Sequence, residues 1–288
     1  MKTHWQDDVL WLETDWQRIR YRRYCNPYHP APRRLLLVHG AGVAGDDTWG
    51  HLVPYLSHWS EVLVPDLRGM GETCYPDGVE RPCRVEEYVD DLVALLDHHG
   101  WWAFDLAGYS LGGLLALLLK ARYPHRVHKQ FLVESALLDR ADMAAVIALR
   151  DRYSEAAQRM REPGGARDGV QFFLDTISPN RILSPRAEAT TIDRLARRSL
   201  GFSYALDAVS EACRRLDRAQ LLAVQKDVSS FVGGRSVEEL HRYQAALAAS
   251  RPDWRYHCIR GCDHSLPFQK PRQVARQMNA DMADYLAR

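Results

Sequence analysis

A glycine-flanked serine is the first feature of the chain that could do chemistry. The pentapeptide GYSLG, residues 108–112, follows a short apolar run typical of a strand and opens an apolar segment typical of a helix. In that setting a G-x-S-x-G pattern makes a sharp turn that holds the serine clear of the sheet, at the positive end of the helix. We therefore expect Ser110 to be a nucleophile, and the alternative is an ordinary helix-capping serine in a glycine-rich turn.

A histidine near the C-terminus is the candidate base. A serine hydroxyl is a weak nucleophile until a neighbouring base takes its proton. The segment RGCDHSLPF places His264 in a turn after the last predicted strand. A loop at that point can reach over the carboxyl ends of the strands, where sites form in open α/β sheets. This position selects His264 from the 12 histidines of the chain.

Two backbone N–H groups are expected to complete an acyl-transfer site. An oxyanion hole needs two donors aimed at the point where negative charge develops. Leu111, the residue after the serine, supplies one of them. The segment HGAG, residues 39–42, follows an earlier predicted strand and supplies the other from Ala41. His39 itself is predicted to be a structural turn residue rather than a proton carrier.

The elements that would position these residues alternate between strand and helix. A hairpin is predicted over residues 9–24, and short apolar runs then alternate with helical segments, of which VEEYVDDLVALLDHHG is an amphipathic example. The alternation predicts an α/β fold with right-handed crossovers, built from residues 1–138 and 223–288. Between them, residues 139–222 are predicted to form a helical insertion.

Several motifs together resemble the α/β-hydrolase superfamily. They are HGAG, PDLRGMGET, GYSLGG with a helix ending in YP, and GCDHS, in that order, and the resemblance covers nearly the whole chain. It implies an α/β-hydrolase fold, with an eight-stranded, mostly parallel sheet and a helical lid inserted after strand six, over the serine. Within PDLRGMGET, Asp66 and Arg68 are interpreted as fold markers and not as catalysts.

The acid of a catalytic triad is the point where the chain departs from that family. In most relatives the acid is an aspartate after the seventh strand. Here the segment is FVGGRSVEEL, and counting back from the histidine puts Ser236 in or near the expected position. A serine carries no charge that could stabilise an imidazolium, so the usual acid is missing.

Glu134 offers another position for the acid. It is the one charged residue of FLVESALL, residues 131–138, and it follows the predicted sixth strand, beside the strand that presents Ser110. An unpaired buried charge is costly, so a carboxylate in such a segment is usually paired or useful. Some members of the superfamily carry their acid at this point, and Glu134 is predicted to orient His264. The alternatives are Glu238, a dyad with no acid, and an ion pair between Glu134 and an arginine of the lid.

Together these features predict a serine hydrolase that cleaves a carboxylic ester of short to medium acyl chain, with no metal or organic cofactor. The residues expected to bind the substrate are Tyr109, Phe172 and Phe202. The alternatives are an acyl-carrier or CoA thioesterase, a hydrolase of carbon–carbon bonds, and a non-catalytic ligand receptor on the same fold. For the thioesterase, Arg197 and Arg198 are candidates to meet a phosphopantetheine or an acidic acyl-carrier protein.

Composition argues against several other classes of function. The chain has 288 residues and a net charge of +1, so no basic excess points to nucleic acid. Its longest apolar stretch, residues 111–119, is well short of the ~20 residues that a membrane helix needs. Asp7 and Asp8 stand where an export signal needs an apolar core. With six scattered cysteines, interpreted as reduced thiols, these features predict a cytoplasmic protein whose partner is a small acyl substrate.

Overall fold

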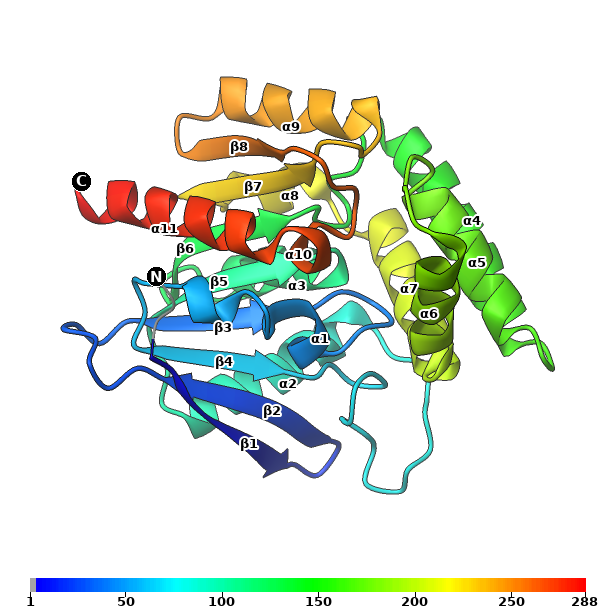
Figure 1. Cartoon of the computed structure of the whole chain (residues 1–288), viewed down its shortest axis with the longest axis horizontal. Coiled ribbons are helices and arrows are strands. Elements are labelled where there is room, and N and C mark those ends of the chain that lie inside the picture. Colours follow the sequence, from blue (N-terminus) through cyan, green and yellow to red (C-terminus); the bar gives the residue numbers. More distant parts are fainter. Residues whose placement is uncertain (1–3) are drawn as a thin grey trace.

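One sheet forms the centre of the fold (Figure 1). The computed structural model describes residues 4–288, so the first three residues of the predicted core segment lie outside the description. The strands are β1 (Gln6–Glu13), β2 (Arg18–Cys25), β3 (Arg34–Val38), β4 (Glu61–Pro65), β5 (Phe104–Tyr109), β6 (Val127–Val133), β7 (Val228–Gly233) and β8 (Trp254–Ile259). In space they follow the order β1-β2-β4-β3-β5-β6-β7-β8. β1 and β2 form the predicted hairpin, β2 also pairs antiparallel with β4, and the other neighbours are parallel. The predicted eight-stranded, mostly parallel sheet is therefore confirmed.

Helices pack on both faces of the sheet. Outside the segment between β6 and β7 they are α1 (Gly45–Trp49), the 3-10 helix η1 (Val53–Tyr55), α2 (Val85–His98), α3 (Leu111–Arg122), α9 (Glu238–Ser250), α10 (Leu266–Gln269) and α11 (Pro271–Leu286). α2 and α3 cover one face, and α1, η1 and α11 cover the other. A strand covered on both faces is apolar throughout. In β3, for example, Leu36 belongs to the cluster with α2 and α3, whereas Leu37 belongs to the cluster with α11.

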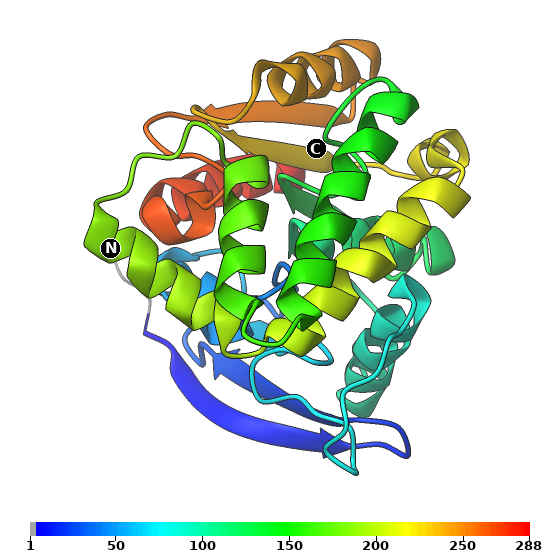
Figure 2. The ribbon, with the colours of Figure 1, turned by 90° about the vertical axis from the view of Figure 1, so that its right-hand side faces the viewer.

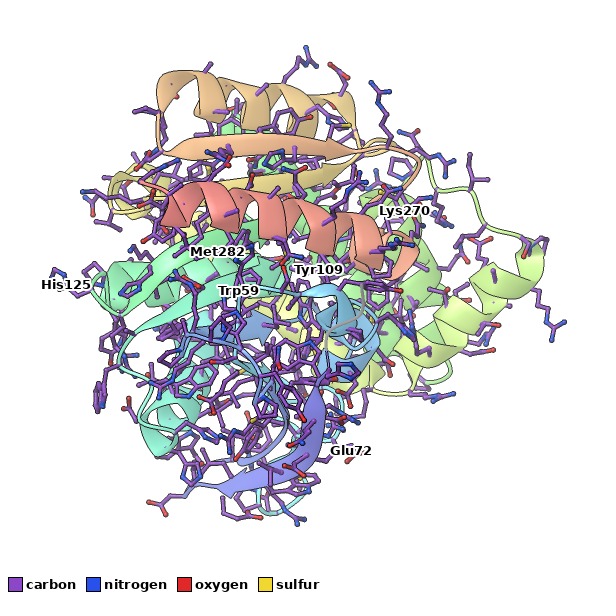
Figure 3. All side chains as sticks on the ribbon, turned by 60° about the vertical axis from the view of Figure 1, so that its left-hand side comes forward. Trp59, Glu72, Tyr109, His125, Lys270 and Met282 are labelled. Atoms are coloured by element: carbon purple, nitrogen blue, oxygen red, sulfur yellow. The ribbon has the colours of Figure 1, made fainter. Side chains whose placement is uncertain are left out.

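Large side chains fill the cluster beneath α11. Met282 of α11 and Trp59, in the loop before β4, are both fully buried there (Figure 3). The Trp59 ring lies edge-on to Phe131 of β6, with 5.9 Å between the ring centroids, and its Nε1–H donates to Asp105 at 2.8 Å. His125, by contrast, projects from the outer surface. This packing fixes the central strands, whose carboxyl ends carry the predicted site residues.

The chain between β6 and β7 folds as helices at one end of the sheet (Figure 2). They are α4 (Met143–Arg161), α5 (Ala166–Ile177), α6 (Pro185–Ala196), α7 (Ser199–Arg215) and α8 (Arg218–Ala223), and we call them the inserted helices. α4 to α7 gather beyond the carboxyl ends of the parallel strands and share an apolar cluster with Val43, which follows β3. α8 packs instead against α3. Over residues 4–288, no helix is both long enough and apolar enough to cross a membrane.

The turn from β5 into α3 is tight and strained. Ser110 at its apex has φ 54° and ψ −113°, a conformation that L-residues rarely adopt. A Cβ on Gly108 would lie 2.1 Å from the carbonyl oxygen of Gly112, and one on Gly112 would lie 2.3 Å from that of Val38. The N–H of Ser110 donates to the carbonyl of Val133 at 2.9 Å, which ties the turn to β6. The two glycines therefore allow the close approach that places Ser110 at the N-terminus of α3.

We expect Gly108→Ala to destabilise the protein by about 3 kcal/mol, because the new methyl group meets backbone atoms that cannot move without shifting α3. Thermal unfolding should then show a midpoint lower by roughly 6–12 °C. Gly100→Ala is the control, since a Cβ there meets nothing within 4 Å and only its positive φ of 61° costs energy, about 1 kcal/mol. Equal midpoints for the two variants would contradict the close packing of the turn.

Candidate active site

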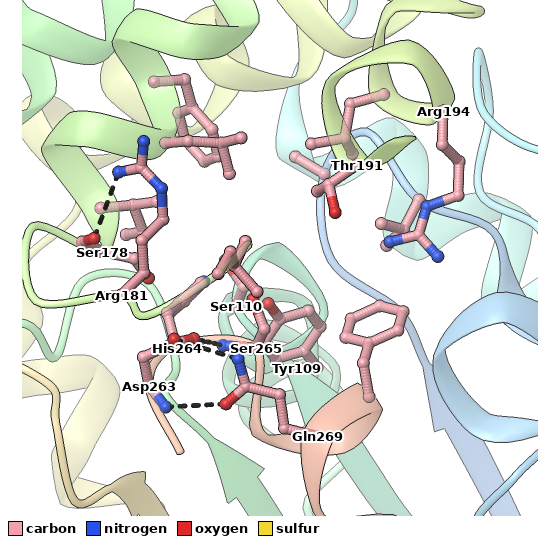
Figure 4. A pocket seen from close by; sticks show the side chains of 18 residues that line it. Tyr109, Ser110, Ser178, Arg181, Thr191, Arg194, Asp263, His264, Ser265 and Gln269 are labelled. Carbon is pink, nitrogen blue, oxygen red and sulfur yellow. Dashed lines mark hydrogen bonds between the residues drawn. The ribbon is translucent and has the colours of Figure 1, made fainter. Parts of the chain in front are cut away.

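Ser110 and His264 line one cavity between the sheet and the inserted helices (Figure 4). The cavity has a volume of about 180 Å³. The apolar residues of its wall on α5 are Phe173, Leu174 and Ile177. His264 comes from the loop after β8, and its ring lies 5.1 Å from that of Tyr109 at the end of β5. The predicted nucleophile and the predicted base are thus brought to the same space.

Glu134 lies against His264 and not against an arginine. Its Oε2 accepts a hydrogen bond from Nδ1 of His264 at 2.7 Å, and the two residues are only 4% and 6% exposed. The buried arginine of α4, Arg150, pairs with Asp139 instead. Glu238, the alternative acid, is exposed at the start of α9. Of the two glutamates considered from the sequence, the structure therefore brings Glu134 to the histidine.

The other oxygen of Glu134 has two donors of its own. Oε1 accepts from the N–H of Gly233 at 2.7 Å and from the hydroxyl of Ser236 at 2.5 Å. Both donors belong to the end of β7 and the loop that follows it. Three hydrogen bonds thus compensate a charge that burial would otherwise make costly. The sequence puts Ser236 near the position of the missing acid, but its role as a donor follows only from the pairing of β6 with β7.

The two predicted oxyanion donors come from different elements. Ala41 lines the cavity, and Leu111 is the first residue of α3, so its N–H has no acceptor within the helix. The loop that carries Ala41 is held by His39. The Nε2 of this ring accepts the N–H of Leu67 at 2.8 Å, and its Nδ1–H donates to the carbonyl of Gly40 at 2.7 Å. Burial lowers the pKa of His39, which favours the neutral ring that these two bonds require.

Asp66 and Arg68 hold loops together. Asp66 accepts the N–H groups of Gly45 at 2.8 Å and of Glu72 at 3.0 Å. Arg68 donates to both carboxylate oxygens of Asp91, at 2.8 and 2.9 Å. Neither belongs to the described residues that line the cavity. These contacts agree with their interpretation as markers of the fold.

Of the aromatic residues predicted to bind substrate, Tyr109 lines the cavity, whereas Phe172 and Phe202 are not among the described residues that do so. Successive residues of a helix point about 100° apart. α5 therefore turns Phe173 to the cavity and Phe172 away from it, where the Arg159 guanidinium lies 4.0 Å from its ring centroid. Phe202 is fully buried beside Phe173, with 5.1 Å between the ring centroids. The structure therefore places Tyr109 at the cavity, and Phe172 and Phe202 outside its described lining.

A known protein family matches most of the chain in sequence. The sequence pattern of the Alpha/beta hydrolase family matches residues 35–277, a span that contains Ser110, Glu134 and His264. The chain belongs to the alpha/beta hydrolase family. The resemblance carried by HGAG, GYSLGG and GCDHS is thereby confirmed.

The names of individual relatives indicate different reactions, and the relatives align with different lengths of this chain. It is 33% identical to the pimeloyl-(acyl-carrier protein) methyl ester esterase of Neisseria meningitidis serogroup C over 240 residues, which are 78% of this chain and 86% of that relative. It is 38% identical to the 2-hydroxy-6-oxo-2,4-heptadienoate hydrolase of Pseudomonas putida over 101 residues, which are 34% of this chain and 36% of that relative. The alignments with the Pseudomonas hydrolase and with four other relatives each cover only 24–39% of the relative's own length.

A solved structure repeats the fold. A thermophilic esterase from Thermogutta terrifontis superposes with a TM-score of 0.71 at 21% identity, covering 96% of this chain and 99% of that one. At this identity the likeness shows the fold alone.

We expect Ser236→Ala to lower the kcat of this hydrolase about fivefold. The variant removes one of the two donors to Oε1 of Glu134, a hydrogen bond worth about 1 kcal/mol. KM should change by less than about twofold, because Ser236 does not belong to the described lining of the cavity. Steady-state kinetics measures both constants, with Ser250→Ala as the control, whose hydroxyl donates to the carbonyl of Leu247. An unchanged kcat in both variants would mean that Oε1 of Glu134 needs only the N–H of Gly233.

Proposed function

We propose that this hydrolase is a serine carboxylesterase in which Ser110 is the nucleophile, His264 the base and Glu134 the acid. The observation that carries the proposal is the 2.7 Å contact between Glu134 Oε2 and His264 Nδ1, beside a cavity that His264 and Ser110 both line. With the ring proton on Nδ1, the Nε2 of neutral His264 can accept the proton of the serine hydroxyl. The strained turn presents that hydroxyl at the N-terminus of α3, where negative charge is favoured.

The proposed reaction has two halves. In the first, Ser110 Oγ attacks the ester carbonyl while its proton passes to His264 Nε2. The N–H groups of Leu111 and Ala41 bind the oxyanion of the tetrahedral intermediate. The intermediate collapses when His264 gives the proton to the departing alkoxide, which leaves an acyl-enzyme and a free alcohol. In the second half, water attacks the acyl-enzyme with His264 as base, and a carboxylic acid and Ser110 are released. Glu134 stabilises the imidazolium throughout without taking its proton.

A short to medium acyl chain is the proposed substrate class. The cavity of about 180 Å³ has an apolar wall that includes Phe173, Ile177 and Phe268. Such walls with a few polar groups are typical of small-molecule sites. Because the inserted helices supply much of this wall, we infer that they act as a lid over Ser110. The Neisseria relative, whose name is that of a methyl ester esterase, supports an ester as the reacting group.

The thioesterase alternative finds less support in the arginines first considered for it. Arg198 pairs with Glu80 at 2.6 Å and donates to the carbonyls of Gly71 and Thr73. These bonds tie the start of α7 to the loop after β4, so the guanidinium is already occupied. Arg197 is exposed. Since the name of the Neisseria relative includes an acyl-carrier protein, an ester presented by such a carrier stays within the proposed class.

Cleavage of a carbon–carbon bond is the second candidate, and the Pseudomonas relative favours it. It would use the same Ser110, His264 and Glu134, but the leaving group would be a carbon atom that must receive the proton as it departs. A receptor that binds its ligand without turnover is the third reading of the same fold. Turnover of defined substrates separates the three.

Ester hydrolysis is tested with p-nitrophenyl esters from acetate to decanoate. We expect wild type to turn over at least one chain length, and Ser110→Ala to lose kcat by a factor on the order of 10⁵–10⁶, because it cannot form the acyl-enzyme. The preferred length then reports the size of the acyl pocket. If wild type hydrolyses no ester, the esterase is wrong. Hydrolysis of a 2-hydroxy-6-oxo-dienoate would in that case favour the carbon–carbon hydrolase, and ligand binding without turnover would favour the receptor.

We expect Glu134→Gln to lower kcat on the best ester by a factor on the order of 10⁴, the scale seen when the acid of a triad is neutralised. The amide is uncharged, so it no longer stabilises the imidazolium of His264. Glu238→Gln is the matched control and should stay within about twofold of wild type, because Glu238 is exposed at the start of α9. The reverse pattern would assign the acid to Glu238.

A further inference from the structure

Most arginines of the inserted helices have carboxylate partners. Examples are Arg150 with Asp139, Arg161 with Asp207, and Arg215 with Glu211. Paired in this way, an arginine contributes no net charge to its surroundings. An arginine on these helices without a partner is therefore an exception that calls for an explanation.

Arg194 of α6 is such an exception. Within residues 4–288 its guanidinium has no hydrogen-bond or ion-pair partner, and its Nε is buried without an acceptor. Five other arginines have an unpaired buried Nε, but their terminal nitrogens bind a carboxylate or a carbonyl. They are Arg20, Arg23, Arg126, Arg150 and Arg251. Arg194 alone among these six has no hydrogen-bond or ion-pair partner for its guanidinium among the described residues.

The guanidinium of Arg194 is part of the cavity that contains Ser110 (Figure 4). It lines that cavity together with Thr191, one turn earlier on the same face of α6. Its central carbon lies 5.1 Å from the ring centroid of Phe268, which also lines the cavity. Burial raises the pKa of Tyr109 well above its ordinary value, and the charge of Arg194 acts in the opposite direction. The positive charge of Arg194 therefore acts on Tyr109, the residue next to Ser110.

The other arginine and the aspartate of the described cavity wall have hydrogen-bond partners within the protein. Arg181 pairs with Asp175 and Glu188, both at 2.5 Å. The carboxylate of Asp263 accepts the N–H of Ser265 at 2.9 Å and the side-chain amide of Gln269 at 3.0 Å. Among the described residues of the wall, Arg194 is thus the one arginine without a hydrogen-bond or ion-pair partner.

We propose that Arg194 binds a carboxylate on the acyl part of the substrate, so that the enzyme prefers monoesters of dicarboxylic acids to neutral esters. The proposal rests on ester hydrolysis at Ser110 and adds the class of acyl group. A guanidinium binds a carboxylate through two parallel hydrogen bonds, which the two terminal nitrogens of Arg194 can donate. The apolar side chains of α5 would pack against the methylene chain that joins the two carboxyl groups.

Monomethyl and dimethyl esters of adipic and pimelic acid test this, because within each pair they differ only in whether the second carboxyl group is free. We expect wild type to favour the monomethyl ester by about tenfold in kcat/KM, measured by methanol release. Arg194→Gln should abolish most of this preference by losing more activity on the monomethyl than on the dimethyl ester. Arg186→Gln is the control, since Arg186 is exposed at the start of α6 and does not belong to the described lining. It should keep the wild-type ratio.

Two kinetic results would overturn the proposal. One is the absence of any preference in wild type, and the other is an equal loss on both esters in Arg194→Gln, which would make the residue structural. Binding of adipate, followed by titration calorimetry, does not depend on turnover. Ser110→Ala should bind adipate, and the double variant Ser110→Ala/Arg194→Gln should bind it about tenfold more weakly. If no ester is hydrolysed but this difference is seen, the esterase is wrong and the carboxylate site stands. If adipate binds both variants equally, or neither, the carboxylate site is wrong.

Discussion

A single buried carboxylate ties together the carboxyl ends of three neighbouring strands. Glu134, which follows β6, receives hydrogen bonds from His264 after β8 and from the segment after β7 that contains Ser236. Without these donors the buried charge would cost several kcal/mol, so the loops cannot separate freely. Ser110 follows the next strand, β5, and its carbonyl accepts the N–H of Ala136 at 3.0 Å. The nucleophile is therefore positioned by the same group of strand ends that carries the carboxylate.

Parallel topology explains how a carboxylate after β6 can take the place of one after β7. The two strands are neighbours in register, with Val133 opposite Phe231, so the residues that follow them emerge side by side. Under the proposed mechanism one histidine needs one acid, and two buried carboxylates at this point would repel each other. A hydroxyl at Ser236 avoids that repulsion and supplies a donor instead. An uncharged residue at position 236 is thus compatible with the carboxylate at Glu134.

The sheet and the place of the chemistry could be predicted from the sequence because both depend on local patterns. Apolar runs define buried strands, and GYSLG defines a strained turn wherever a strand meets a helix. The inserted helices are different, because their side chains are sorted by packing between distant segments. Phe172 and Phe173 are equally apolar neighbours, and only the docking of α5 decides which one faces the cavity. Arg198 pairs with Glu80, which is 118 residues away in the sequence, whereas Arg194 faces the cavity. No local pattern distinguishes these two arginines.

Charge compensation divides the cavity between its two walls. On the side of the sheet, hydrogen-bond donors of the protein stabilise the charge of Glu134, so this carboxylate needs no partner from the substrate. On the side of the inserted helices, the positive charge of Arg194 has no carboxylate partner among the described residues. Beside apolar side chains such as Phe268, that charge is stabilised only by water or by an anion. A substrate that brings its own carboxylate meets this need when it binds, and a neutral substrate displaces the water without replacing it.

Selectivity would then arise on α6, whereas bond cleavage depends on the strand ends. The two can vary independently, because Arg194 shares no hydrogen bond with Glu134 among the described residues.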